Sequence, residues 1–258
     1  MRPDRVVLEP WDYVNHLKRV RKIEKIEVNE ICLCCFDSRV MKRIAEKTGA
    51  KTTNNWIFRD MKRRELLNFS IGEGEASAYR FEFGAPHAGA MLEILIACGA
   101  KVFIVLGSAG ALQHGIELGD FVVAKQAVVD EGLSHHYLGS VSIVDGSGEI
   151  IDTLISSCQR SGVRFHVGST LSTDALFRET EEKVLRYRRE GVLAVDMEAS
   201  ALYAISKFRG AKMGCIFYVS DSLAEMEWRP GFHEPTVKKS INHGVDIALE
   251  AAKLLIAN

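Results

Sequence analysis

The chain has 258 residues, of which 47% are apolar and 26% are charged, and its formal net charge is −1. This composition is typical of a globular protein, and the near-zero charge argues against nucleic acid as the main partner. No apolar run is long enough to span a membrane, and the N-terminus lacks the apolar core of a secretory signal. We therefore expect a cytoplasmic protein with no membrane partner.

Six cysteines are spread along the chain: Cys32, Cys34, Cys35, Cys98, Cys158 and Cys215. All have apolar neighbours, and a chain of this size does not depend on disulfides, so we interpret them as buried, reduced thiols. The run from Cys32 to Cys35 lacks zinc-ligand spacing, and the adjacent His135 and His136 point in different directions. The sequence therefore predicts no metal site.

The first strand and helix follow a charge-rich N-terminal extension, residues 1–29. The apolar run 30–35 predicts a buried strand, and Asp37 or Ser38 can cap a helix over 39–47 that ends at Gly49. Arg39 falls in the first turn, among free N–H groups where an anion can bind. A cation there opposes the helix dipole, so Arg39 either binds an anion or forms a salt bridge with Asp37.

Alternating strands and helices fill the middle of the chain. A turn at 72–75 separates two strands, the second over 78–83, and Pro86 begins a helix that runs to Cys98. A buried strand over 101–106 leads into a loop of small residues, 107–111, which lets backbone N–H groups approach a ligand. The strand over 121–129, the helix over 148–161 and the strand over 164–171 follow.

The last third of the chain places acids at two strand ends. A strand over 192–195 runs into Asp196-Met-Glu198 and then a helix to about Arg209. Acids there either bind a ligand at the carboxyl end of a strand or favour the helix dipole. A strand over 211–219 ends in Ser220-Asp221, and a helix over 235–257 closes the chain. The alternation predicts one α/β domain over 1–258 with a mainly parallel sheet.

Four motifs, in this order, resemble the type I nucleoside phosphorylase superfamily, which contains purine nucleoside, uridine and methylthioadenosine phosphorylases. They are Gly107-Ser-Ala-Gly110, Gly119-Asp120, Val195-Asp-Met-Glu-Ala-Ser-Ala-Leu-Tyr203 and Val219-Ser-Asp221. The resemblance covers about residue 30 to the end. It implies a three-layer α/β/α fold with a mixed, mostly parallel, partly barrel-like sheet. It also implies a homo-oligomer built from dimers, commonly a hexamer, that needs no cofactor beyond orthophosphate as co-substrate.

The resemblance also implies a sugar site. Glu198 would bind the ribose hydroxyls, and Met197 would pack against the sugar. The backbone at Gly84 would approach the ribose, and His16 would be lent to the ribose site of a neighbouring subunit.

On the base and phosphate sides, the resemblance assigns five residues. Asp221 would donate a proton to N7 of a purine, and Leu176 or Phe177 would pack on the base. From the residues alone, the loop over 172–177 either covers a flat heterocycle or belongs to the core. Ser108 and Arg39 would bind phosphate.

The base and the nucleophile are set by other positions. Uridine-specific members carry a Gln and an Arg where this chain has Thr180 to Glu182, which favours a purine. At the phosphate site, Cys35 replaces a Gly, Val105 replaces an Arg, and the Arg lent by a neighbour falls at Trp56 or Ile57. Each lost hydrogen bond to a charged group contributes roughly 1.5–3 kcal/mol. Two lost arginines weaken phosphate binding by roughly two to four powers of ten.

Three functions are compatible with these departures. The first is a phosphorylase with a rebuilt phosphate site, for which Arg59, Lys62, Arg63 or Arg64 are candidate cations. The second is a nucleosidase that uses water. Methylthioadenosine nucleosidases share Gly-Ser-Ala-Gly and lack the strand Arg, but they have a catalytic Glu where this chain has Arg39. The third is a nucleoside-binding relative with little catalysis, against which Glu198 and Asp221 argue.

Overall fold

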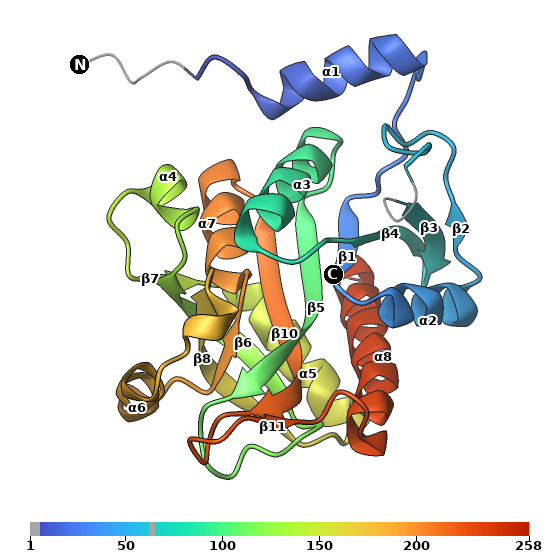
Figure 1. Ribbon diagram of the computed structural model, residues 1–258. Coiled ribbons are helices and arrows are strands. Elements are labelled where there is room, and N and C mark those ends of the chain that lie inside the picture. The colour runs from blue at the N-terminus through green and yellow to red at the C-terminus, as the bar shows by residue number, and fades with distance from the viewer. Residues whose placement is uncertain (1–5, 62–64, 258) are drawn as a thin grey trace.

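The computed structural model describes residues 6–61 and 65–257 (Figure 1). The helices are α1 (Pro10–Arg21), α2 (Ser38–Thr48), α3 (Ala85–Ala97), α4 (Ser134–Leu138), α5 (Gly148–Ser161), the 3-10 turn η1 (Leu176–Arg178), α6 (Glu181–Arg189), α7 (Ala199–Arg209) and α8 (Pro235–Ala257). The strands are β1 (Ile31–Cys35), β2 (Lys51–Thr52), β3 (Leu66–Ile71), β4 (Gly74–Arg80), β5 (Val102–Ala111), β6 (Phe121–Asp130), β7 (Ile143–Asp145), β8 (Phe165–Thr173), β9 (Ala194–Asp196), β10 (Lys212–Ser222) and β11 (Arg229–Pro230). Within the described ranges, no helix has the length and apolar character needed to cross a membrane.

All eleven strands belong to one mixed sheet, in the order β11-β10-β6-β8-β9-β5-β1-β4-β3-β2, with β7 paired to β6. Strand β10 also pairs with β5, so the strands from β10 to β5 close on themselves. Strands β1, β4, β3 and β2 extend from β5 as an open sheet, whereas β11 pairs with β10. The predicted mixed, partly barrel-like sheet is confirmed.

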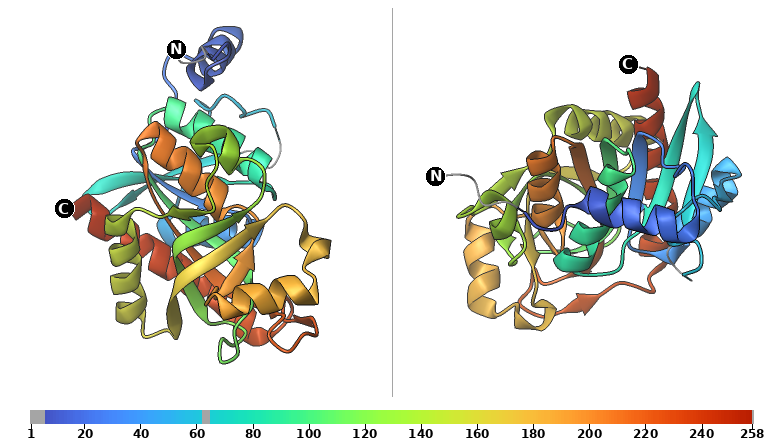
Figure 2. Two further views of the ribbon diagram at one scale, coloured as in Figure 1. Left: turned by 90° about the vertical axis from the view of Figure 1, so that its left-hand side faces the viewer. Right: turned by 90° about the horizontal axis from the view of Figure 1, so that it is seen from above.

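Helices cover both faces of this sheet (Figures 1 and 2). Helices α2, α5 and α8 share one apolar core, to which they contribute Val40, Leu154 and Val245. Helices α3 and α7 share the other core through Leu92 and Leu202. Helix α1, which the sequence did not predict, packs against the outer side of α3. The three-layer arrangement expected from the sequence is therefore present.

Two strands are longer than predicted, and this changes the interpretation of the small residues. Residues 107–111, predicted as a loop, continue β5 as a strand. The prediction was wrong because these residues serve strand packing: a Cβ on Gly107 would lie 2.7 Å from the Phe217 ring. Strand β10 likewise continues through Asp221, with a register shift between Val219 and Asp221. Strand β4 spans Gly74–Arg80 rather than 78–83. The chain turns at Gly72, and β4 pairs with β3 directly after this turn.

Tyr203 of α7 joins two strands of the closed part of the sheet. Its hydroxyl donates to the Ala124 carbonyl at 2.6 Å and accepts the Cys215 N–H at 2.9 Å. Ala124 of β6 and Cys215 of β10 are register partners, so the phenol completes their pairing. The side chain is 1% exposed, and no water reaches these groups if the hydroxyl is absent.

We expect Tyr203→Phe to lower the free energy of unfolding by about 1–3 kcal/mol, because it leaves a buried donor and a buried acceptor unsatisfied. Urea denaturation followed by circular dichroism measures this change. Tyr13→Phe on the exposed side of α1 is the matched control and should leave the midpoint unchanged. Equal midpoints for both variants would contradict the bridging role.

Candidate active site

Glu198 is buried where β9 passes into α7. It is the residue before the first turn of α7, with φ −142° and ψ −25°, and it is 5% exposed. Its Oε1 accepts the backbone N–H of Gly84 at 2.6 Å. Gly84 has φ +96°, a conformation that other residues rarely adopt, so this N–H is aimed by a glycine-specific turn. Two of the four residues predicted for the sugar side, Glu198 and Gly84, are therefore brought together.

Asp196 holds this turn in place. Its Oδ1 accepts the N–H groups of Glu198 and Ala199 and the Ser172 hydroxyl, each at 2.8 Å. These bonds satisfy the free donors at the start of α7, as a helix cap does. Asp196 is thus the acid that caps the start of α7, whereas Glu198 is the acid that accepts the Gly84 N–H. Met197 lies between them and is half-buried.

Burial raises the pKa of the Glu198 carboxyl to about 8, and the charge of Asp196 acts in the same direction. The Gly84 hydrogen bond favours the ionised form but does not outweigh burial. At neutral pH, much of this carboxyl carries its proton. Burial also raises the pKa of Asp196.

Asp221, the predicted acid on the base side, is fixed by two donors. Its Oδ1 accepts the Ser220 hydroxyl at 2.7 Å, and its Oδ2 accepts the Trp228 indole N–H at 3.0 Å. Trp228 is 60% exposed and lies in the segment between β10 and β11. Sequence reasoning missed Trp228, because a single aromatic residue in a loop carries no periodic signal.

Strand β5 brings the sugar and base sides together. Gly110 pairs with Val195 of β9 on one side and with Asp221 of β10 on the other. A Cβ at Gly110 would meet Asp221 Oδ2 at 3.1 Å and Val195 Cγ1 at 3.3 Å. The glycine therefore allows Asp221 of β10 and Val195 of β9, the strand that leads to Glu198, to approach one point of β5.

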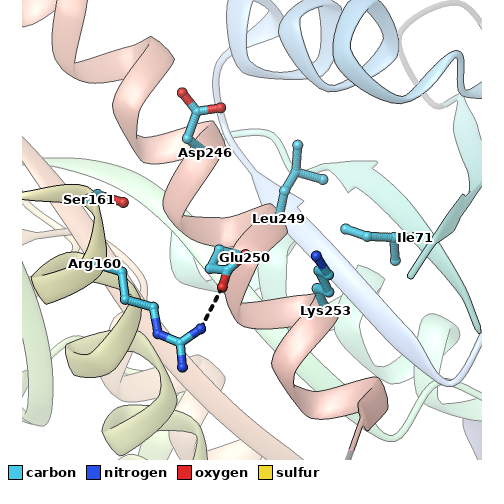
Figure 3. A pocket seen from close by; sticks show the side chains of 7 residues that line it. All are labelled: Ile71, Arg160, Ser161, Asp246, Leu249, Glu250 and Lys253. Atoms are coloured by element: carbon cyan, nitrogen blue, oxygen red, sulfur yellow. Dashed lines mark hydrogen bonds and ion pairs between the residues drawn. The ribbon is translucent and has the colours of Figure 1, made fainter. Parts of the chain in front are cut away.

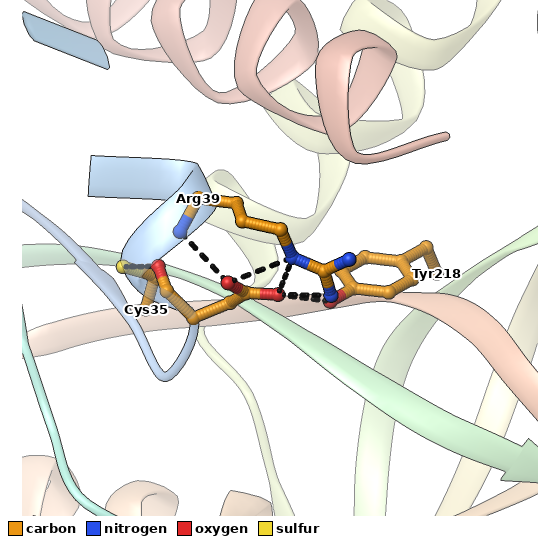
Figure 4. Close-up of polar contacts among 4 residues, drawn as sticks. Cys35, Arg39 and Tyr218 are labelled. Carbon is orange, nitrogen blue, oxygen red and sulfur yellow. Dashed lines mark hydrogen bonds and ion pairs between the residues drawn. The ribbon is translucent and has the colours of Figure 1, made fainter. Parts of the chain in front are cut away.

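Of the two predicted phosphate residues, Ser108 lies on β5 and Arg39 lies in the first turn of α2, and both already have partners. Ser108 is the register partner of Tyr218 on β10. The Tyr218 hydroxyl donates to Asp37 at 3.4 Å, and Arg39 donates to the same carboxylate through Nε and Nη2 at 2.8 and 2.6 Å (Figure 4). The salt bridge between Arg39 and Asp37, one of the two interpretations of Arg39, is present.

The predicted base-packing residues are exposed on η1: Leu176 is 49% and Phe177 is 94% exposed. Glu179, the residue that follows η1, is half-buried. Burial and the negative charge of Asp221 raise the pKa of Glu179 to about 7, which places the two acids in each other's field. The sequence did not single out Glu179, because its proximity to Asp221 depends on how η1 turns.

His16, predicted for the ribose site of a neighbour, is exposed on α1. The departures from the phosphate pattern are all buried: Cys35 and Trp56 are 1% and 0% exposed, and Val105 is 0% exposed. Arg59 donates to the carbonyls of Asn54 and Arg21, away from the strand ends. The other candidate cations, Lys62, Arg63 and Arg64, lie outside the described residues.

A hollow of about 400 Å³ lies between α5 and α8 and contains none of these residues (Figure 3). Arg160 Nη1 lies 2.9 Å from Glu250 Oε1, and Asp246 pairs with Lys47 of α2. The hollow is open, and its lining lacks the buried acids of the strand ends. None of the residues predicted for the sugar, base or phosphate lines this hollow.

The raised pKa of Glu198 predicts how stability depends on pH. Between the ordinary carboxyl pKa near 4.5 and about 8, the unfolded chain loses this proton while the folded chain keeps it. Stability therefore falls as pH rises through this window. Glu198→Gln removes the effect, so the variant should lose less stability than the wild type between pH 5 and pH 8. Thermal unfolding at several pH values measures this change in stability. Glu75→Gln, at an exposed position of β4, is the control. Parallel curves of stability against pH for all three proteins would contradict the prediction.

The chain is similar to known proteins over most of its length. The chain matches the family described as the phosphorylase superfamily over residues 30–256. It is 27% identical to a guanosine phosphorylase from Halorubrum lacusprofundi, over 78% of this chain and 82% of the relative. It is 34% identical to a uridine phosphorylase from Thermococcus kodakarensis, over 52% of this chain and 53% of the relative. It is 30% identical to a DeoD-type purine nucleoside phosphorylase from Dichelobacter nodosus, over 62% and 67%.

The crystal structure of uridine phosphorylase from Vibrio fischeri ES114 superposes with a TM-score of 0.77 at 25% identity, covering 90% of this chain and 94% of the other. The family match begins within one residue of β1 and runs almost to the end of α8. It therefore includes the strand ends that carry Glu198 and Asp221. The chain belongs to the phosphorylase superfamily.

Proposed function

We propose that this chain cleaves purine nucleosides with orthophosphate. The C1′–N9 bond breaks with its electron pair passing to the base, a phosphate oxygen forms the new bond to C1′, and a proton reaches N7 of the base. The products are the free purine and pentose 1-phosphate. The observation that carries the proposal is the convergence on Gly110 of the strands that lead to a buried acid, Glu198, and to a second acid, Asp221.

Glu198 suits the sugar side. Its carboxyl is held by the Gly84 N–H and is largely removed from water, so its strongest new partners are polar groups of a bound ligand. Two adjacent ribose hydroxyls match its two oxygens. As the C1′–N9 bond breaks, positive charge develops on the sugar ring, and the ionised form of Glu198, which the Gly84 hydrogen bond favours, stabilises that charge.

Asp221 suits the base side. The Trp228 indole N–H donates to Asp221 Oδ2 at 3.0 Å, so a purine reaching this oxygen takes the place of the indole. Protonation of N7 neutralises the electrons left on the base, and a positioned acid contributes typically about 10²–10⁴-fold. Glu179, with its pKa raised to about 7, is a second carboxyl that can supply protons beside Asp221.

The choice of purine rests on the loop before α6. A uracil ring presents two carbonyl acceptors and one N–H, which suits an amide and a guanidinium such as the Gln and Arg of uridine-specific members. Here Thr180 caps α6, accepting the Lys183 N–H at 3.4 Å, and Glu181 and Glu182 are exposed in its first turn. Relatives named for guanosine, uridine and purine nucleosides exist. This loop aligns the chain with the purine group.

Hydrolysis by water is a second candidate, and one observation favours it. The Arg39 side chain, which is predicted with Ser108 to bind phosphate, is already bound by Asp37. The same carboxylate also accepts the Tyr218 hydroxyl. Hydrolysis by water does not require another cation in place of Arg39. The two reactions differ only in the nucleophile, so the same assay separates them.

The nucleophile test incubates the protein with inosine, guanosine, adenosine and uridine, with and without orthophosphate. We expect free purine and pentose 1-phosphate only when phosphate is present, and slower cleavage of uridine. Chromatography of both products measures the outcome. Base release at equal rates without phosphate favours hydrolysis, whereas nucleoside binding without release would assign a binding function.

We expect Asp221→Asn to reduce kcat for inosine by about 10²–10⁴-fold, because the amide cannot donate the carboxyl proton to N7. The nucleoside 7-methylguanosine already carries a methyl group and positive charge at N7, so its cleavage should change far less. The control is Asp152→Asn on the exposed side of α5, which removes the same charge far from β10. Equal losses for inosine and 7-methylguanosine would exclude Asp221 as the acid.

A further inference from the structure

The carboxylate of Asp37 binds several donors at the start of α2. Its Oδ1 accepts the backbone N–H of Arg39 at 2.8 Å and Nε at 3.1 Å. Its Oδ2 accepts Nε at 2.8 Å, Nη2 at 2.6 Å and the Tyr218 hydroxyl at 3.4 Å (Figure 4). A bound oxyanion uses the same kinds of donor: a backbone N–H, a guanidinium fork and a hydroxyl.

Helix capping explains only part of this arrangement. A cap requires one side-chain oxygen on one backbone N–H, and Asp37 Oδ1 provides it. A cation in the first turn is unfavourable because it faces the positive end of the helix dipole, so the Arg39 side chain does not serve the stability of α2. Its guanidinium instead lies against an anion, with buried Tyr218 on the inner side. In the free protein that anion is Asp37.

The charge of Asp37 is present over the neutral range. Its side chain is 21% exposed, against 51% for Arg39, so the acid is the deeper partner. Burial acts to raise the pKa of Asp37, but the hydrogen bonds and charge of Arg39 outweigh it and hold the pKa below its usual value. An incoming phosphate therefore meets a full negative charge, and two anions at contact distance cannot share one guanidinium edge.

The neighbouring cation is arranged in the same way. Arg80 at the end of β4 is the register partner of Cys35, and its Nη2 donates to Glu82 at 2.7 Å. Val105, and Trp56 or Ile57, at which the resemblance places the arginines of the phosphorylases, are buried apolar residues. Among the described residues, the arginines on either side of Cys35 are thus each bound to a carboxylate two residues away in the sequence.

We propose that Asp37 is an internal competitor of orthophosphate, which must displace its carboxylate from Arg39 and Tyr218 before attack on the nucleoside. This proposal rests on the proposed phosphorolysis. It assigns Asp37 a specificity role: the residue sets how much phosphate the enzyme requires and how well water competes as nucleophile. The apparent affinity for phosphate is lowered by the fraction of molecules in which Asp37 occupies Arg39.

Asp37→Asn tests this, because Asn keeps the helix cap but removes the charge. We expect the KM for orthophosphate to fall roughly ten- to hundredfold, the ratio expected for losing a competing hydrogen bond to a charged group. Titration calorimetry with inorganic phosphate should show the same gain. Glu46→Gln on the same helix is the matched control, since Glu46 pairs only with Lys42 and Arg43 among the described side chains. Asp37→Ser, another good cap that is too short to reach the guanidinium, is the second variant.

The outcomes separate this proposal from the proposed function. An unchanged or higher phosphate KM in both Asp37 variants, with phosphorolysis intact, overturns the competitor role and makes Asp37 a residue that orients Arg39. If neither the wild type nor either variant forms pentose 1-phosphate, the phosphorolysis itself is wrong. If only the variants form it, Asp37 is confirmed as the residue that excludes phosphate.

Discussion

The site depends on a capping interaction between one buried carboxylate and the first turn of one helix. Asp196 accepts the N–H groups of Glu198 and Ala199, and its position fixes where α7 begins. A buried charge is tolerated only where donors surround it, and the free N–H groups of a helix start supply them. Glu198 follows directly and is carried to the Gly84 N–H by this geometry. Glu198, the acid proposed for the sugar side, is therefore placed by a second acid, Asp196, that caps the helix.

Small residues in β5 allow the remaining parts to meet. Gly107 lies under the Phe217 ring, Ser108 lies beside Tyr218, and Gly110 lies between Val195 and Asp221. A larger side chain at either glycine would push apart strands that carry different functional groups. One strand thus aligns the sugar, base and anion sides of the site, and its sequence is constrained by packing as much as by chemistry.

The sequence was sufficient for features with local signals. Asp37 and Gly49 mark the ends of α2, and the apolar runs mark the strands whose ends carry Glu198 and Asp221. It was insufficient where position depends on tertiary contacts. Trp228 reaches Asp221 from a loop without periodicity, and the small residues of β5 are typical of a loop until the strands around them are known. The sequence left two alternative partners for Arg39, a bound anion or Asp37. The structure shows that the partner in the free protein is Asp37.

The burial of Trp56 limits which substitutions the protein can accept at this position. It packs edge-on against Phe58 and Tyr79, with ring centroids 5.6 and 5.7 Å away. Replacing such a core aromatic by a smaller residue costs about 3–5 kcal/mol, and an arginine there would also bury a charge. Restoring a second phosphate-binding arginine at this position thus requires several coordinated substitutions in the core. Asp37, at the start of a helix and partly open to solvent, can change by a single substitution, so the proposed competition with phosphate can be altered at this position, whereas the core around Trp56 resists such a change.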